Sequence, residues 1–194
     1  MMEQMQRAPD WIAHIADVQM KATPGSFWRY KEWDPILLHA IIGKVYGGTV
    51  RDAVSELLYK PLDITDTSFE VYDDGFTDVI NALPQYKRNT LAYAGYKQMT
   101  AKNMVKIGRL MLLSGQWEGK RVVSEKFIHE SIQPSKASNS YGYLWWLEKN
   151  RYRALGFGGQ EISVYPDSNV VIVVQATATT SNKHYPDISE NLIR

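Results

Sequence analysis

The chain has 194 residues, enough for one sizeable core, and its 44% apolar and 12% aromatic content is typical of a globular protein. Its 22 basic and 21 acidic residues nearly cancel and form no basic stripe, which argues against a nucleic-acid partner. The absence of cysteine excludes disulfides, thiol nucleophiles and thiolate metal sites, and leaves the redox compartment open.

Neither a secretory leader nor a membrane span is indicated by the sequence. Charges at Glu3, Arg7 and Asp10 interrupt the apolar run that a signal peptide needs. The longest apolar stretch, 170–174, is too short to cross a bilayer as a helix. We therefore expect no membrane span, and the cellular compartment stays open.

Three helices are predicted in the first sixty residues. Asp10 is an N-cap for an amphipathic helix that ends before 23–25, Asp34 with Pro35 begins a second helix, and Thr49 caps a third that runs to position 60. The second helix carries one apolar stripe at helical spacing, formed by Leu37, Leu38, Ile41, Ile42 and Val45.

Helices continue to Pro134 and strands follow it. Residues 63–98 have no sustained period and are predicted as a long connection, whereas Thr100 and Ser124 begin two further helices. Segments 141–147, 161–166 and 169–176 are rich in aromatic and β-branched residues, with a turn signal at 166–169, which predicts an antiparallel meander of about three strands. Residues from 186 to 194 begin a final helix.

The predicted fold class is therefore α+β, of the α/β sandwich type. We expect a single domain over 1–194, mainly helical over about 1–134, with antiparallel strands over about 140–178.

One glycine-rich cluster could carry chemistry. Gly156, Phe157, Gly158, Gly159 and Gln160 precede a predicted strand, where glycines allow a ligand to approach the backbone closely. A plain turn or bulge explains the same residues equally well. The four histidines are isolated from one another, so no metal site and no cofactor are predicted.

Tyr30 is a second candidate, because the adjacent cation of Lys31 favours a phenolate that could act as a base. The alternative is that Phe27, Trp28, Tyr30 and Trp33 form one packing cluster, which the general burial preference of aromatic residues favours.

Five segments, in order, resemble the β-lactamase-related serine hydrolases, a group that includes class C β-lactamases, D-Ala-D-Ala carboxypeptidases and 6-aminohexanoate-dimer hydrolases. Segment 23–47 is similar to the family's Pro-Gly-x-x-Phe-x-Tyr-Ser-Asn stretch and the helix after it, and 58–69 is similar to its Pro-Leu-Gly-Ile segment. Segments 99–131, 140–147 and 156–174 resemble its helix pair and the strands that line its active site. The resemblance implies a β-lactamase/transpeptidase-like fold.

The resemblance also implies site residues. Tyr30 takes the place of the tyrosine that assists proton transfer, the Phe157 N–H is the strand-side oxyanion donor, and Ala154 with Gly156 takes the place of Lys/His-x-Gly. Substrate contacts are implied for Lys31, Glu32, Ala154, Gly156, Gly158, Gly159 and Gln160. The implied substrate is a small amide or ester, or a peptide.

The departures from the family pattern are informative. Glu32 stands in place of the usual asparagine, and Ala154 replaces the lysine or histidine, which argues against recognition of a β-lactam carboxylate. No lysine has a serine three residues before it; the nearest match ends at Lys183, in a polar tail. The final helix also stops early at Arg194, and uncovered strand edges favour self-association.

Three hypotheses follow. The chain is the C-terminal part of a truncated serine hydrolase that lacks its nucleophile segment and is inactive alone; it is a non-catalytic peptide- or peptidoglycan-binding module on the same fold; or it is an enzyme that uses another nucleophile, Thr180 or Ser26.

Overall fold

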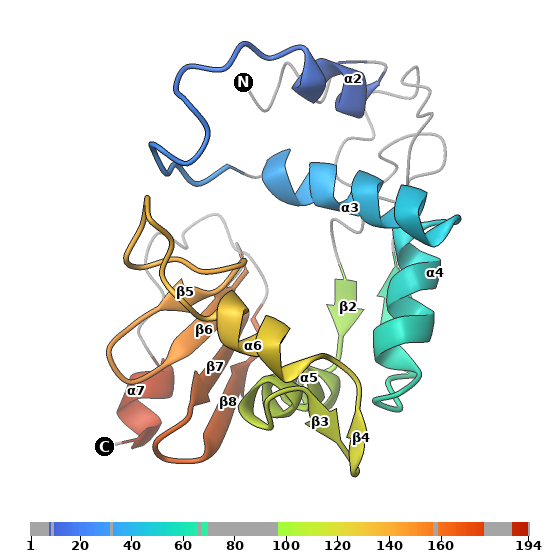
Figure 1. Cartoon of the computed structure of the whole chain (residues 1–194). Coiled ribbons are helices and arrows are strands. Elements are labelled where there is room, and N and C mark those ends of the chain that lie inside the picture. Colours follow the sequence, from blue (N-terminus) through green and yellow to red (C-terminus); the bar gives the residue numbers. More distant parts are fainter. Residues whose placement is uncertain are drawn as a thin grey trace. The chain divides into compact units, whose positions relative to one another are not determined.

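The computed structural model describes residues 8, 10–31, 33–65, 67–69, 97–156, 159–176 and 188–193 (Figure 1). The chain divides into two compact units. The first, unit 1, comprises 1–24, 29–60 and 67–98, and the second, unit 2, comprises 25–28, 61–66 and 99–194. Each unit is described by itself.

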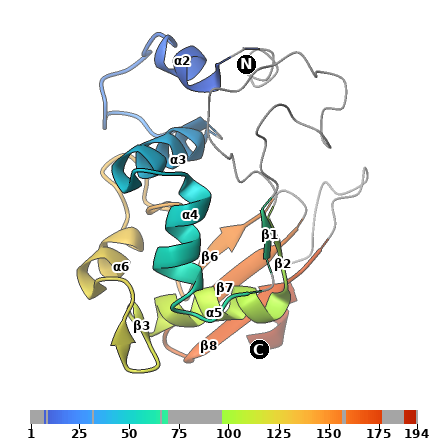
Figure 2. The same cartoon turned by 90° about the vertical axis from the view of Figure 1, so that its right-hand side faces the viewer.

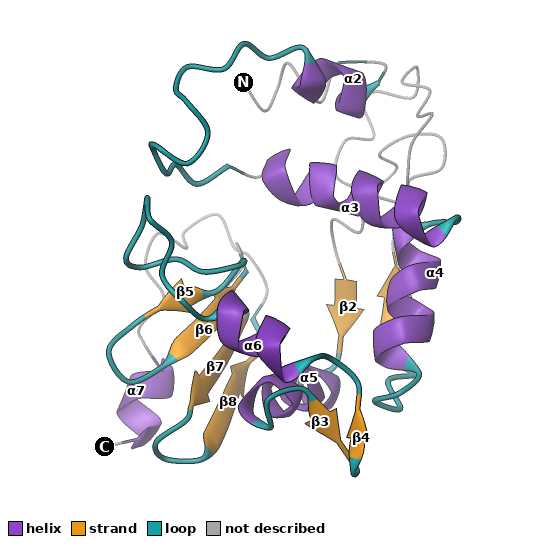
Figure 3. Cartoon of the chain, viewed as in Figure 1, coloured by secondary structure: helices purple, strands orange, loops and turns teal. Residues whose placement is uncertain are grey.

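Unit 1 is built mainly from helices (Figure 3). They are α2 (Trp11–Ala16), α3 (Trp33–Tyr46), α4 (Val50–Val54) and the π-helical turn η1 (Ser55–Tyr59) that continues α4. Asp10 caps α2 as predicted, since its side chain accepts a hydrogen bond from the Ala13 N–H at 2.9 Å. Trp11, Ile15 and Ile36 are buried together, so α2 and α3 share one small apolar cluster.

A capping box begins α4. The Asp52 N–H donates to Thr49 Oγ1 at 3.1 Å, while the Asp52 carboxylate accepts from the Thr49 N–H and hydroxyl. These hydrogen bonds hold the pKa of Asp52 below its ordinary value of 3.8. The predicted third helix is thereby confirmed at its N-cap.

Two short strands lie within and at the end of the stretch predicted as a connection. β1 (Thr67–Phe69) and β2 (Lys97–Met99) form a two-stranded sheet. The rest of that stretch falls mostly outside the described residues. Three-residue strands are too short to show the alternation by which a strand is recognised, which explains the difference.

Unit 2 holds the remaining elements. They are α5 (Ala101–Leu112), β3 (Gln116–Trp117), β4 (Lys120–Arg121), α6 (Glu125–Ser131), β5 (Trp146–Leu147), β6 (Tyr152–Leu155), β7 (Glu161–Tyr165), β8 (Val170–Val174) and α7 (Ile188–Ile193). The predicted N-caps of α5 and α6 are confirmed, because Thr100 accepts from the Asn103 N–H at 3.3 Å and Ser124 from the Phe127 N–H at 3.2 Å. The short hairpin of β3 and β4 was not predicted.

The sheet of unit 2 is antiparallel throughout, in the order β5-β6-β7-β8. It has four strands where the sequence predicted about three, because β6 was missed. One face packs against α5, as Figure 2 shows, and Ile162 and Val164 of β7 belong to the buried cluster there. Gly108 permits this close approach, since a Cβ at that position would lie 2.4 Å from Val171 Cγ1.

The opposite face of β7 is polar. Glu161, Ser163 and Tyr165 alternate with the apolar residues of the strand, and all three are buried together with Ser189 of α7.

Within the part of the chain that the structure describes, no helix is long and apolar enough to cross a membrane.

Candidate active site

Gly156, Gly159 and Gln160 of the predicted glycine cluster lie in the connection between β6 and β7. Leu155 pairs with Glu161 as the last register pair, and beyond it the Gly156 N–H donates to the Gln160 carbonyl at 2.8 Å. The Gly159 N–H donates to the Gly156 carbonyl at 3.0 Å, and Gly159 has φ of 85°, a conformation that favours glycine. The described ends of the connection, Gly156, Gly159 and Gln160, are therefore joined by backbone hydrogen bonds.

Gln160 explains why position 156 is a glycine. A Cβ at Gly156 would lie 2.4 Å from Gln160 Oε1, so the amide of Gln160 lies directly over Gly156. The same amide donates from Nε2 to the Ala176 carbonyl, just after β8, at 2.8 Å. The sequence predicted that a ligand could approach the backbone of this cluster closely; at Gly156 the group that does so is the side chain of Gln160.

Ala154 lies on the α5-facing side of the sheet. It pairs with Ile162 across β6 and β7 and packs against the apolar cluster of unit 2. A methyl group there offers neither the charge nor the donor that a lysine or histidine would present to a carboxylate. An alanine at position 154 therefore cannot bind a carboxylate by charge or by a side-chain hydrogen bond.

Tyr30 and Lys31 belong to unit 1, in the segment just before α3. Tyr30 is 50% exposed, which is more than a packed core tyrosine would be. Ala154, Gly156, Gly159 and Gln160 are brought together in unit 2, whereas Glu32, Phe157 and Gly158 lie outside the described residues. The roles inferred for all of them remain predictions.

The two alternative nucleophiles gain no support. Ser26 is exposed in unit 2, and Thr180 lies outside the described residues. Across the described ranges of the chain, no three His, Cys, Asp or Glu side chains gather where they could hold a metal ion.

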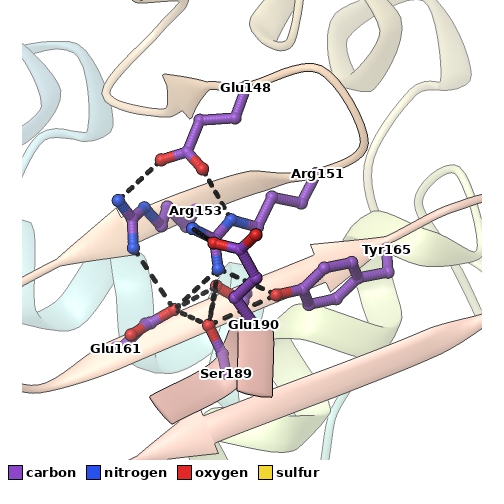
Figure 4. Close-up of polar contacts among 8 residues, drawn as sticks. Glu148, Arg151, Arg153, Glu161, Tyr165, Ser189 and Glu190 are labelled. Atoms are coloured by element: carbon purple, nitrogen blue, oxygen red, sulfur yellow. Dashed lines mark hydrogen bonds and ion pairs between the residues drawn. The ribbon is translucent and has the colours of Figure 1, made fainter. Parts of the chain in front are cut away.

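A buried polar network, which the sequence analysis missed, lies beside the hairpin (Figure 4). It consists of Glu148, Arg151, Arg153, Glu161, Ser163, Tyr165, Ser189 and Glu190. Arg153 directly precedes Ala154, and Glu161 directly follows Gln160. The network therefore holds both strands at the point where they enter the turn.

Arg151 is the centre of this network. Its guanidinium donates to Glu148 Oε2 at 2.7 Å, to Tyr165 Oη at 2.8 Å and to Ser189 Oγ at 2.7 Å. Ser189 in turn donates to Glu161 Oε1 at 2.6 Å, and that carboxylate also accepts from Ser163. Charges so deeply buried are tolerated only when they are paired and hydrogen-bonded.

A sequence signal for the network exists. In β7 the polar residues Glu161, Ser163 and Tyr165 recur at every second position, which is the period of one strand face. Glutamate is uncommon in strands, and a buried glutamate such as Glu161, at the start of β7, requires a cation, which Arg151 and Arg153 supply from the start of β6 and from β6 itself.

Solved structures share this fold. A candidate β-lactamase from Bacteroides dorei DSM 17855 matches with a TM-score of 0.70 at 16% identity, over 89% of this chain and 56% of that one. A candidate 6-aminohexanoate-dimer hydrolase from Bacillus anthracis matches with 0.66 at 22% identity, over 87% and 43%. A penicillin-binding protein from Bacillus halodurans matches with 0.63 at 19% identity, over 84% and 56%.

These likenesses confirm the predicted fold, and the chain spans about half the length of the solved structures that it matches. The family assignment comes from the sequence itself. The model of the β-lactamase family matches residues 1–192. Because this match covers nearly the whole chain, the protein belongs to the β-lactamase family.

Proposed function

We propose that this chain is the C-terminal part of a serine hydrolase, that it lacks the Ser-x-x-Lys segment, and that it is inactive alone. In the completed protein the serine hydroxyl adds to the substrate carbonyl and gives its proton to the lysine. The bond to the leaving amine or alcohol then breaks as the tyrosine delivers a proton to that group, and water hydrolyses the resulting acyl-enzyme to release the acid and restore the serine hydroxyl. Tyr30 is the proposed tyrosine base, and the Phe157 N–H is one proposed oxyanion donor.

The observation that carries the proposal is the hairpin between β6 and β7 in a chain of this family. Backbone hydrogen bonds join Gly156 to Gly159 and Gln160 at the base of its turn, and buried ion pairs hold its strands together. Oxyanion donors need such preorganisation, because their benefit depends on not having to reorient during the reaction. The sequence contains this proposed part of a site and no serine three residues before a lysine.

The substrate we propose is a small uncharged amide or ester, or a peptide. Ala154 offers no charge to a substrate carboxylate, so β-lactams with their carboxylate are the less favoured members of this class. Lys31, Glu32, Gly158 and Gln160 are proposed substrate contacts.

The test combines gene sequence and enzymology. The DNA directly upstream of Met1 is expected to encode an in-frame Ser-x-x-Lys, and the polypeptide it encodes is produced as a separate upstream segment. Hydrolysis of p-nitrophenyl esters and of nitrocefin is then measured for the chain alone, for the segment alone and for their mixture. We expect ester hydrolysis only in the mixture.

The matched control is an upstream segment in which the serine of Ser-x-x-Lys is alanine, which should bind the chain without restoring hydrolysis. Hydrolysis by the chain alone contradicts the proposal. An upstream DNA region that encodes no Ser-x-x-Lys also contradicts it. In that case, binding of a peptidoglycan peptide to the chain, measured by calorimetry, would favour the non-catalytic binding module.

A further inference from the structure

One carboxylate oxygen on β7 receives contacts from both neighbouring elements and from its own strand (Figure 4). Glu161 Oε1 accepts hydrogen bonds from the hydroxyl of Ser163, on the same strand, and from that of Ser189 on α7, the latter at 2.6 Å. The same oxygen lies 3.8 Å from Arg153 Nη1 on β6 and 4.0 Å from Nη1 of Arg151, which directly precedes β6. Glu161 therefore joins β6, β7 and α7.

Glu161 is also the first residue of β7, directly after the connection that leaves β6. In the register of the two strands it is opposite Leu155, the last residue of β6, and Arg153 is opposite Ser163. The ion pair between Arg153 and Glu161 is thus a diagonal pair on one face of the sheet, within reach of long side chains. It links the two strands at the place where the connection begins and ends.

The charges of this network lie in the interior of unit 2, where Glu161 is 7% exposed and Arg151 is 4% exposed. Replacement of a buried ion pair by apolar residues of similar volume is often neutral or stabilising, so stability alone does not require such a network. Hydrogen bonds between buried groups have preferred geometries, whereas apolar packing is non-directional. The network is therefore suited to fixing the position of β6 relative to β7.

We propose that Glu161 is a positioning residue of the hydrolase, which fixes the ends of β6 and β7 and so holds the connection between them in place. This inference rests on the proposed function, which assigns an oxyanion donor to that connection. The side chain of Glu161 lies on the polar face of β7, opposite the face that packs on α5, and acts through the backbone. An oxyanion donor must already be oriented, and a displacement of about 1 Å can slow a reaction about hundredfold.

Amide hydrogen exchange in the full chain, followed residue by residue by NMR, tests the positioning without any upstream segment. The reporters are the N–H groups of Gly156 and Gly159, which donate hydrogen bonds within the connection at 2.8 Å and 3.0 Å. The reference is the N–H of Leu110, a buried residue within α5. Glu161→Gln removes the charge and keeps the size of the side chain. We expect exchange at the two glycines to become about tenfold faster, or more, relative to Leu110.

Glu190→Gln is the matched control, because it makes the same chemical change in the same network but on α7, where the carboxylate is 49% exposed and lies 4.0 Å from Arg151 Nη2. Exchange at the two glycines should change by less than about twofold in this variant. Equal acceleration by both variants would overturn the proposal. So would equal acceleration at the glycines and at Leu110 in Glu161→Gln, because Glu161 would then stabilise unit 2 as a whole.

If Glu161→Gln does not fold, Glu161→Asp is measured in its place. This variant keeps the negative charge and shortens the side chain by a single methylene, so the contacts of the carboxylate are lengthened while the arginines keep a partner. Faster exchange at the two glycines than at Leu110 again supports the proposal, and equal exchange at all three overturns it.

Kinetics of the mixture of chain and upstream segment separate this inference from the proposed function. Glu161→Gln should lower kcat for ester hydrolysis about tenfold to hundredfold and leave KM nearly unchanged, since an oxyanion donor acts on the transition state. If the natural chain is active in the mixture and Glu161→Gln has the same kcat, the inference is overturned and the proposed function stands. If the natural chain shows no hydrolysis in the mixture, the proposed function fails and the inference fails with it.

Discussion

The guanidinium of Arg151 donates a hydrogen bond from Nη1 to the hydroxyl of Ser189 at 2.7 Å (Figure 4). This contact joins two parts of the chain that are 38 residues apart, the start of β6 and the C-terminal helix α7. Ser189 is fully buried, and its hydroxyl in turn donates a hydrogen bond to Glu161 Oε1. The helix α7 is therefore anchored to the sheet by polar contacts.

We predict that Ser189→Ala destabilises unit 2 by about 1–3 kcal/mol, because it leaves a buried donor of Arg151 and a buried acceptor of Glu161 without this partner. The measurement is urea-induced unfolding, read as a shift in midpoint at constant slope. Leu192→Ala, exposed on the same helix, should shift the free energy of unfolding by less than about 0.5 kcal/mol. Equal effects of the two changes would show that the network does not stabilise the fold.

Gly156→Ala should disturb the candidate site through Gln160. The new Cβ would lie 2.4 Å from Gln160 Oε1, so the amide must move and give up its hydrogen bond to the Ala176 carbonyl. The expected cost is about 1 kcal/mol in the free energy of unfolding, measured by urea titration.

A double-mutant cycle checks this cause. In a Gln160→Ala background the 2.4 Å contact with Oε1 is removed and only the tight 3.2 Å contact with the Cβ of residue 160 remains, so adding Gly156→Ala should cost less than it does in the natural chain. A full additional cost in that background would mean that the backbone of the turn, and not Gln160, requires glycine.

The helix starts could be predicted from the sequence because a cap is a local interaction. Asp10, Thr49, Thr100 and Ser124, each predicted at a helix start, accept a hydrogen bond from an N–H three residues ahead. The N-cap predicted at Asp34 is wrong, because α3 begins at Trp33 and Asp34 lies within it. Such contacts depend on neighbouring residues alone, so tertiary packing changes them little.

Long-range polar contacts could not be predicted in the same way. β6 was missed because arginines at 151 and 153 hide its strand pattern, and their partners Glu161 and Ser189 lie far along the chain. The apolar stripe of α3 was predicted from its spacing, yet it is exposed within unit 1. Periodicity shows that a face is apolar but not which element covers it.

Stability of unit 1 should fall in acid through Asp52. Its pKa is lowered in the folded chain, first by the Thr49 side-chain hydrogen bond and then by the Thr49 backbone. A lowered folded pKa means that the contribution is present above the unfolded pKa and is lost as pH falls through the folded value. Asp52→Asn should therefore be less stable than the natural chain at pH 6, with a difference that fades below about pH 4.

The pH series of urea midpoints has an internal control. In a Thr49→Ala background the leading cause of the shift is absent, so the difference between Asp and Asn at position 52 should depend less on pH. If the stability difference between Asp and Asn at position 52 keeps the same pH dependence in this background, a group other than the Thr49 side chain causes the lowered pKa of Asp52.

Tyr30→Phe tests the proposed base in the mixture of chain and upstream segment. The change keeps the ring and removes only the hydroxyl, so we expect kcat for ester hydrolysis to fall by about 10²–10⁴ while KM changes little. Tyr143→Phe is the matched control, since Tyr143 is a similarly exposed tyrosine in unit 2, at 55% against 50% for Tyr30. If both variants hydrolyse ester like the natural chain, the hydroxyl of Tyr30 has no part in proton transfer.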